Sequence, residues 1–332
     1  MLGKSVGRPF SRRAGYAGAV ALAVLVCLAA SIPVLAQVAP IKPYKDDLFQ
    51  NHVISTLYGG DMRFVEYSKQ RDLYGRDQVV EKKAYEKYVS LEPSALQHDL
   101  VLPGRGVRYI AVGRTDRPAH FIVIFLHGGG NGSRMQAVDD WSFGGNFNRL
   151  KNLVVRNDGL YLSPDFNGFG GEGRDDIKAL MATYGAKSPG APIIVACTSL
   201  SGWLCFDLMA DERSAARLGG VLLLGSLVEE KQFLTSAVFA DRKLYVPIFI
   251  GHGSKDSILD WVTQETFFKK VKAAAPEYPI RFDVFVNGFH GTPMRLVDWR
   301  RVLNWMLGEQ GGQASADRIS AGSTPPERTA PQ

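Results

Sequence analysis

Two short runs of consecutive apolar residues, Phe121–Leu126 and Pro192–Cys197, constrain the fold more than any other feature of the 332-residue sequence. Runs that are apolar at every position are typical of strands buried on both faces, as in parallel sheets. Segments long enough for helices separate these runs from further apolar runs, so strand and helix alternate between residues 96 and 307. This alternation predicts an α/β fold, in which a mainly parallel sheet is flanked by helices on both faces.

The individual elements of this fold can be placed along the sequence. The sequence Pro103-Gly104-Arg105-Gly106 is typical of a hairpin turn and joins the first two extended runs. Strands are expected at Leu96–Leu102, Val107–Val112, Phe121–Leu126, Gly159–Ser163, Pro192–Cys197, Gly220–Leu224, Val246–Ile250 and Arg281–Val286. Helices are expected at Phe143–Val155, Asp175–Tyr184, Leu200–Met209, Trp261–Ala275 and Val297–Leu307.

Polar residues with catalytic chemistry follow several of these strands. Ser199, Asp256 and His290 each come shortly after an expected strand, in that order along the chain. The carboxyl ends of parallel strands meet at one edge of the sheet, so we expect these three side chains to lie together. The strand at Phe121–Leu126 is followed by His127-Gly128-Gly129-Gly130, which places a glycine cluster at the same edge.

The order Ser…Asp…His, preceded by the HGGG sequence, resembles that of the α/β-hydrolase family over roughly residues 96–307. In that family the nucleophile lies in a G-x-S-x-G turn between a strand and a helix. This sequence has Cys197 and Ser201 where the pattern has glycine. Both replacements are small, as a tight turn between strand and helix requires, and Gly202 follows directly.

The resemblance implies a role for each of the three polar residues. Ser199 is expected to be the nucleophile, His290 the base that takes its proton, and Asp256 the acid that orients the imidazole. Two alternatives lie nearby. Ser201 is a second candidate nucleophile, but its place after the strand fits the turn less well, and Asp260 is a second candidate acid that better suits a helix start.

Backbone N–H groups are expected to stabilise the negative charge that develops on the attacked carbonyl oxygen. By the same resemblance, one N–H belongs to Leu200 and the other to the glycine cluster, most simply to Gly129, with Gly128 close by. His127 and His252 also precede glycine at strand ends, and we expect both to form structural hydrogen bonds in their loops.

No metal, cofactor or nucleic-acid partner is expected. The sequence contains no H-x-x-x-H, C-x-x-C or G-x-x-x-x-G-K-[ST] pattern. The formal net charge is +6, but four of the 39 basic residues and none of the 33 acidic residues lie within residues 1–36. The rest of the chain is close to neutral and has no long basic run, which disfavours nucleic acid as a partner. The oligomeric state stays open.

The N-terminal residues predict export. Residues 1–13 are basic, an apolar stretch runs from Ala14 to Ala36, and Ala36 itself suits the position before a cleavage site. We expect a signal peptide at residues 1–36 and a periplasmic or secreted mature protein that begins at Gln37. The alternative is an uncleaved N-terminal membrane anchor, because the apolar stretch is about long enough to span a bilayer.

Three further segments carry weaker signals. Residues 37–95 are polar and irregular, and we expect an N-terminal extension that packs on the main domain at residues 96–307. Residues 308–332 lack apolar periodicity and are expected to be a disordered tail. Cys197 and Cys205 are expected to be two buried thiols, because a strand end and the second turn of a helix are poorly placed for a disulfide.

These features together predict an exported serine hydrolase, most simply a carboxylic-ester hydrolase that acts through an acyl-enzyme on a small-molecule or polymer ester. Only about twenty residues, 225–245, lie where the family often inserts a lid, so a large cap over the site is not expected. A serine peptidase on the same fold and a non-catalytic binding protein with a degraded site are the alternatives.

Overall fold

A computed structural model of the chain describes residues 40–308. The expected signal peptide at residues 1–36 lies outside the described residues, as does the expected tail at residues 308–332 apart from its first residue. No helix within residues 40–308 is long and apolar enough to cross a membrane.

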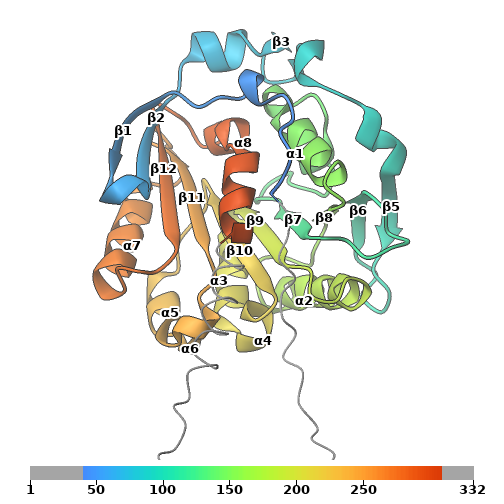
Figure 1. The fold of residues 1–332 in the computed structure, drawn as a ribbon, viewed down its shortest axis with the longest axis vertical. Helices are drawn as coiled ribbons and strands as arrows, with labels where there is room; N and C mark the ends of the chain where they lie inside the picture. The colour runs from blue at the N-terminus through green and yellow to red at the C-terminus, as the bar shows by residue number, and fades with distance from the viewer. Residues whose placement is uncertain (1–39, 309–332) are drawn as a thin grey trace, which may run out of the picture. The chain divides into compact units, whose positions relative to one another are not determined.

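A ten-stranded sheet forms the centre of the structure (Figure 1). Its strands are β1 (Val53–Leu57), β2 (Met62–Glu66), β5 (Gln97–Val101), β6 (Arg108–Val112), β7 (Ile122–Leu126), β8 (Leu160–Pro164), β9 (Ile193–Thr198), β10 (Leu218–Leu224), β11 (Ile248–Gly253) and β12 (Ile280–Val286). Their spatial order is β1-β2-β12-β11-β10-β9-β7-β8-β6-β5. Neighbours from β2 to β8 are parallel, while β1 and β6 are antiparallel to the strands beside them. A separate small sheet pairs β3 (Asp77–Val79) with β4 (Lys83–Ala84).

Helices cover both faces of the sheet, and the core is therefore divided into two layers. One layer holds α2 (Gly171–Lys187), α3 (Gly202–Ala210) and α7 (Trp261–Ala274), and the other holds α1 (Asn146–Val155), α8 (Thr292–Leu296) and a helix over residues 299–308. Successive side chains along each central strand point to opposite faces of the sheet and so pack in different layers. In β7, Ile122 and Ile124 pack in the first layer, whereas Val123 and Phe125 pack in the second.

The expected fold class is confirmed, because the sheet is mainly parallel and has helices on both faces. Every strand and helix expected between residues 96 and 307 is present, with ends that differ by a few residues. The helix expected from Phe143 begins only at Asn146. Gly144 and Gly145 hold positive φ angles of 63° and 74°, which a regular right-handed helix cannot accommodate.

Residues 53–66, in the segment expected to be an irregular extension, form two strands of the main sheet. β2 runs parallel to β12, with Met62 and Val65 fully buried. Arg63 lies opposite Asp283 in this pairing, and its guanidinium donates hydrogen bonds of 2.8 and 2.5 Å to the Asp283 carboxylate. The ion pair compensates the charge of Arg63, which allows β2 to lie beside the buried strand β12.

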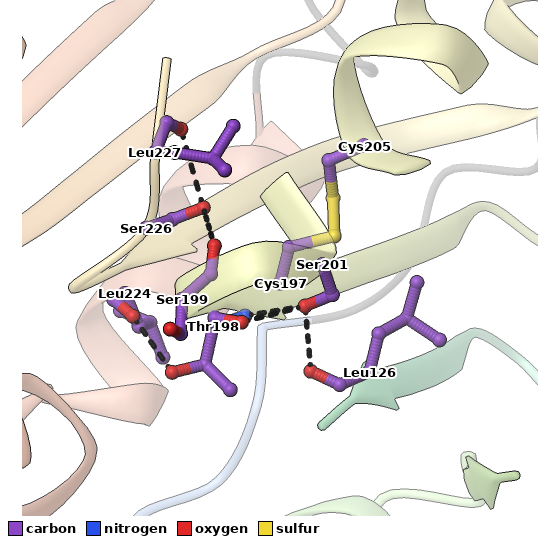
Figure 2. Close-up of a disulfide and its surroundings, with 9 residues drawn as sticks. All are labelled: Leu126, Cys197, Thr198, Ser199, Ser201, Cys205, Leu224, Ser226 and Leu227. Atoms are coloured by element: carbon purple, nitrogen blue, oxygen red, sulfur yellow. Dashed lines mark hydrogen bonds between the residues drawn. A yellow bond between two sulfur atoms is a disulfide. The ribbon is translucent and has the colours of Figure 1, made fainter. Parts of the chain in front are cut away.

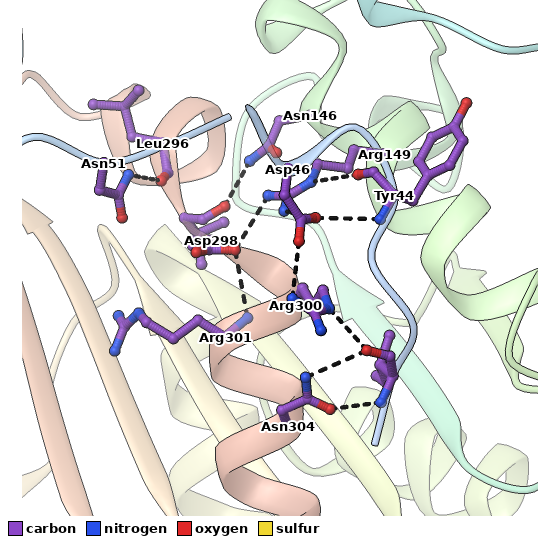
Figure 3. A network of polar contacts seen from close by, with 12 residues as sticks. Tyr44, Asp46, Asn51, Asn146, Arg149, Leu296, Asp298, Arg300, Arg301 and Asn304 are labelled. Carbon is purple, nitrogen blue, oxygen red and sulfur yellow. Dashed lines mark hydrogen bonds and ion pairs between the residues drawn. The ribbon is translucent and has the colours of Figure 1, made fainter. Parts of the chain in front are cut away.

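Hydrogen bonds hold the start of the described chain against the last helix (Figure 3). The N–H of Ile41 donates to Asn304 Oδ1 (2.7 Å). Asp46 accepts from Arg149 Nη2 (2.9 Å) and from Arg300 Nη1 (2.8 Å), and the Arg149 side chain is only 1% exposed. Burial alone would raise the pKa of Asp46. The hydrogen bond and charge of Arg149, together with the charge of Arg300, lower the pKa by more than burial raises it, so the net shift is downward.

Asp46→Asn is expected to lower the free energy of unfolding at about pH 7 by about 1.5–3 kcal/mol, the usual contribution of a hydrogen bond to a charged group. Because the pKa of Asp46 is lower in the folded state, its contribution is present above the unfolded pKa and is lost as the pH falls through the folded pKa. Urea unfolding of both proteins at about pH 7 and about pH 3 measures this, and the difference should shrink at the lower pH.

Asp47→Asn is the matched control, because Asp47 is exposed and accepts only a 3.4 Å hydrogen bond from Gln50. It should change the free energy of unfolding by less than about 0.5 kcal/mol. Equal losses in the two variants, or a loss for Asp46→Asn that grows towards acidic pH, would contradict the assignment of Asp46 as the anchor of this segment.

Candidate active site

The carboxyl end of β9 turns directly into a helix, and Ser199 occupies the turn. β9 ends at Thr198, the 3-10 turn η8 covers Ser199–Ser201, and α3 begins at Gly202. Ser199 has a φ of 53°, in the left-handed region that residues other than glycine adopt rarely. This sharp change of direction lifts the Ser199 side chain out of the sheet at its carboxyl edge, as in the nucleophile turn of the family that the sequence resembles.

Hydrogen bonds from the segment after β10 hold this conformation. The N–H of Ser199 donates to Gly225 O (3.1 Å), and Ser199 O accepts from the N–H of Leu227 (3.2 Å). The Ser226 hydroxyl also donates to Ser199 O at 3.2 Å (Figure 2). The turn is therefore fixed by the neighbouring strand end as well as by its own sequence.

The expectation of two buried thiols is wrong, because Cys197 and Cys205 form a disulfide (Figure 2). The turn at Ser199 folds α3 back over β9, and Cys205 lies in the first turn of α3 rather than the second. The two Cα atoms are 6.3 Å apart, within the range of about 4.4–6.8 Å that a disulfide requires. Both cysteines are fully buried, and the bond links β9 to α3 covalently within the core.

The alternative nucleophile, Ser201, is fully buried, and its hydroxyl is occupied by the backbone. Its oxygen accepts from the N–H of Thr198 (2.8 Å) and lies within 3.0 Å of the Leu126 carbonyl oxygen, to which it can donate (Figure 2). Ser199, in contrast, is partly exposed. The G-x-S-x-G pattern has a glycine at the position of Ser201. In this chain the backbone of a neighbouring segment comes close at Gly202 instead, where a Cβ would lie 2.8 Å from the Leu227 carbonyl oxygen.

The structure brings Asp256 and His290 together. His290 Nδ1 lies 2.7 Å from Asp256 Oδ2, and the Asp256 side chain is fully buried while that of His290 is 21% exposed. The other carboxylate oxygen accepts from the N–H groups of Ile258 (2.9 Å) and Leu259 (3.1 Å). The alternative acid, Asp260, instead caps the start of α7 and lies on the surface.

A second histidine contacts the same carboxylate. His252 Nε2 lies 3.1 Å from Asp256 Oδ2 and 3.0 Å from the Leu259 carbonyl oxygen. Both contacts require a hydrogen on Nε2, because a carbonyl oxygen can only accept. His252 was expected to form only structural hydrogen bonds in its loop. Its position four residues before Asp256, at the end of β11, is the only signal in the sequence that could have indicated this contact.

These hydrogen bonds determine the charge of Asp256. Burial of the side chain would raise its pKa, but the hydrogen bonds from His252 and His290, and those from the N–H groups of Leu259 and Ile258, lower it more. The net shift is strongly downward, so the carboxylate stays ionised throughout the neutral pH range.

Ser199 and His290 both lie close to Gly225. Gly225 O accepts the Ser199 N–H, and a Cβ placed on Gly225 would lie 3.6 Å from His290 Nδ1. Within residues 40–308 no hydrogen bond joins the Ser199 hydroxyl to His290. Hydrogen bonds between catalytic groups are often long in unliganded enzymes and shorten when a substrate binds.

The glycine cluster after β7 packs against the Ser199 turn. A Cβ on Gly128 would lie 3.0 Å from Ser199 Cβ, and a Cβ on Gly129 would lie 2.7 Å from Leu200 Cδ1. His127 donates from Nδ1 to Gly128 O at 2.8 Å, which fixes the peptide plane that carries the Gly129 N–H. The three expected oxyanion residues, Gly128, Gly129 and Leu200, therefore meet beside Ser199.

No group of three or more His, Cys, Asp or Glu residues in the described part of the chain is arranged to hold a metal ion. No family model and no curated protein sequence matches this chain.

Solved structures do match it. They include an α/β serine hydrolase homologue from Coxiella burnetii (14% identity, TM-score 0.45, 63% of this chain and 95% of that chain) and an esterase from Pyrococcus furiosus (14%, 0.46, 66% and 96%). A thermophilic esterase from Thermogutta terrifontis has 14% identity and a TM-score of 0.44, with 70% of this chain and 97% of that chain covered. Similarity at these identities concerns the fold.

The contact between His252 and Asp256 can be tested by measuring the pKa of Asp256. His252→Ala removes one hydrogen bond to the charged form of the carboxylate, so the pKa of Asp256 should rise. His252→Gln keeps an N–H donor near the position of Nε2 and should retain much of the downward shift. Carboxyl ¹³C NMR titration of the folded protein gives the pKa in each case.

His127→Ala is the control, because His127 also lies at a strand end but hydrogen-bonds a carbonyl rather than Asp256. An Asp256 pKa that is the same in wild type and His252→Ala, or that rises as much in His127→Ala, would show that His252 does not stabilise the carboxylate.

Proposed function

We propose that this chain, which has the α/β-hydrolase fold, is an exported serine hydrolase that cleaves carboxylic esters through a covalent acyl-enzyme. One observation carries the proposal. Ser199 stands in a left-handed turn at the sheet edge, and both Ser199 and the His290 of the 2.7 Å His290–Asp256 pair lie close to Gly225. A strained, partly exposed serine beside a histidine with its own carboxylate is the arrangement that activates a hydroxyl nucleophile.

The first half of the reaction forms the acyl-enzyme. His290 Nε2 takes the proton of the Ser199 hydroxyl while the serine oxygen attacks the ester carbonyl carbon. Asp256, which stays ionised, accepts the hydrogen on His290 Nδ1 and so leaves Nε2 free to act as the base. The N–H groups of Gly129 and Leu200 stabilise the oxyanion. His290 then gives the proton to the leaving alcohol oxygen as the C–O bond breaks.

The second half releases the acid. A water molecule gives a proton to His290 and attacks the acyl carbon, and the resulting intermediate collapses when His290 returns that proton to Ser199. Each proton taken by His290 is thus given back, and the enzyme ends in its starting state. The products are the alcohol and the carboxylic acid.

The surroundings of the site favour an ester substrate of modest size. Between β10 and β11 the chain forms only the short helices α5 (Glu230–Leu234) and α6 (Ala237–Ala240) and a 3-10 turn, so no large cap arises from this segment. An open site of this kind admits small esters and the ends or loops of a polymer ester. Peptide hydrolysis and binding without catalysis are distinguished from it by the experiments below.

Ser199→Ala should reduce ester hydrolysis by at least about 10³-fold, because the nucleophile is removed while the packing of β9 and α3 is kept. Ser201→Ala should retain substantial activity, since the lost hydroxyl serves only the backbone. Rates on short-chain p-nitrophenyl esters measure both effects, and mass spectrometry after treatment with a fluorophosphonate should locate the label on Ser199.

Label on Ser201, or a Ser199→Ala variant as active as wild type, would show that the nucleophile has been assigned to the wrong residue. A protein that takes up no label and cleaves neither esters nor peptides would favour a binding function. Cleavage of peptides in preference to esters would favour the peptidase.

Export is the second part of the proposal. The N-terminal sequence supports it, and so does the buried Cys197–Cys205 disulfide, because disulfides form and persist mainly in oxidising compartments. A chain expressed in bacteria with its full N-terminus should be recovered from the periplasm or the medium, and mass spectrometry should find Gln37 as the first residue. Recovery from the membrane fraction with residues 14–36 still attached would instead establish an N-terminal anchor.

A further inference from the structure

A cavity of about 320 Å³ lies beside His290 and has no part in the catalytic steps above. Its walls come from the segment before residue 95, from the loop after β7 and from the residues after β12, and they include Tyr67, Glu81, Phe143, Phe289, Gly291 and Arg295. Pockets for small molecules have volumes of about 300–1,000 Å³. This cavity therefore has room for one compact chemical group.

Aromatic side chains form much of the wall. The rings of Tyr67 and Phe289 meet edge to face, with centroids 6.4 Å apart and an interplanar angle of 88°. Phe143 reaches the other side, where its ring lies 3.5 Å from the position of a Cβ on Gly291. Aromatic walls favour a ring over a saturated group of equal size, because the edge of one ring is attracted to the face of another. The Tyr67 hydroxyl makes no hydrogen bond to any residue between 40 and 308, so it can bind a polar substituent.

The charges around the cavity are of both signs and favour a neutral group over an ion. The Arg295 guanidinium is almost fully buried and donates to both carboxylate oxygens of Asp77 (3.0 and 2.9 Å), so its charge is compensated. The Lys69 ammonium lies 5.2 Å from the centroid of the Phe289 ring. The Glu81 carboxylate makes no hydrogen bond or ion pair with any other described residue, and it leaves a negative charge at the rim.

The position of the cavity indicates which part of an ester would enter it. Phe289 and Gly291 line the cavity and are the neighbours of His290 in the chain, so the Cα atom of each lies about 3.8 Å from the Cα atom of His290. His290 must contact the leaving oxygen in order to protonate it. The glycine cluster and Leu200, which are expected to bind the carbonyl oxygen, do not line the cavity.

We propose that this cavity binds the alcohol part of the ester and selects a neutral aromatic alcohol, such as a benzyl or hydroxybenzyl group. The inference rests on the proposed ester hydrolysis and adds a substrate class to it. It also gives the N-terminal segment a function, since Tyr67 and Glu81 both come from that segment.

Matched esters test the ring preference. Benzyl acetate and cyclohexylmethyl acetate have the same acyl group and primary alcohols of similar basicity, so a difference in kcat/KM reports on recognition of the ring. Wild type should favour benzyl acetate by about two- to tenfold. Phe289→Leu should bring this ratio close to one, and because Phe289 is 43% exposed, the variant should fold. Tyr74→Leu, at an exposed tyrosine outside the cavity, should keep the wild-type ratio.

A charged ester tests the role of Glu81. Wild type should cleave 4-carboxybenzyl acetate less efficiently than benzyl acetate, and Glu81→Gln should reduce this discrimination by about two- to fivefold, as expected for one partly screened charge. Glu86→Gln removes an exposed carboxylate of the same segment that does not line the cavity, and it should leave the discrimination unchanged.

Binding can be measured without catalysis. Ligand-detected NMR should find benzyl alcohol bound to wild type and to Ser199→Ala, and much more weakly to Phe289→Leu. Equal kcat/KM for the two uncharged esters, or equal binding of benzyl alcohol by wild type and Phe289→Leu, would overturn the assignment of the cavity. If benzyl alcohol binds in this way but no ester is cleaved, the assignment of the cavity as a site for aromatic alcohols is kept. Only the proposed ester hydrolysis is then rejected.

Discussion

The left-handed backbone of Ser199 is the constraint on which the candidate site depends. Such a conformation costs about 1–3 kcal/mol for a residue with a side chain and persists only where the surroundings enforce it. Here the Gly225 carbonyl and the Leu227 N–H hold the two sides of the residue, and the Cys197–Cys205 disulfide joins the flanking strand and helix. A Cβ on Gly225 would lie 2.9 Å from the His290 carbonyl oxygen, so the residue that holds Ser199 also lies close to His290.

The sequence was sufficient to predict the fold class and the contact between Asp256 and His290, for one physical reason. Strands buried on both faces must be apolar throughout, which makes them visible as runs such as Phe121–Leu126, and parallel strands present their carboxyl ends at one edge. Residues that follow such runs must therefore gather there. The 2.7 Å contact between Asp256 and His290 confirms this expectation for the pair.

Other features depended on details that periodicity does not encode. The disulfide became possible because α3 begins at Gly202, which places Cys205 in its first turn, and a shift of a few residues would have separated the two sulfur atoms. β2 was hidden because Arg63 interrupts an apolar pattern, and its charge partner Asp283 lies 220 residues away in the chain. The cavity likewise joins Tyr67 to Phe289, side chains that no local pattern connects.

The attachment of the N-terminal segment to the last helix also has a consequence for the order in which the chain folds. The hydrogen bond between Ile41 and Asn304 spans 263 residues, and the ion pair between Asp46 and Arg300 spans 254. Contacts across such long loops form late, because the entropy of loop closure must be lost before they can stabilise anything. A partly synthesised chain lacks the helix that binds Ile41 and Asp46. The segment that contains Ile41 and Asp46 can therefore attach only after the last helix has been synthesised, so its contacts are among the last that the chain can form.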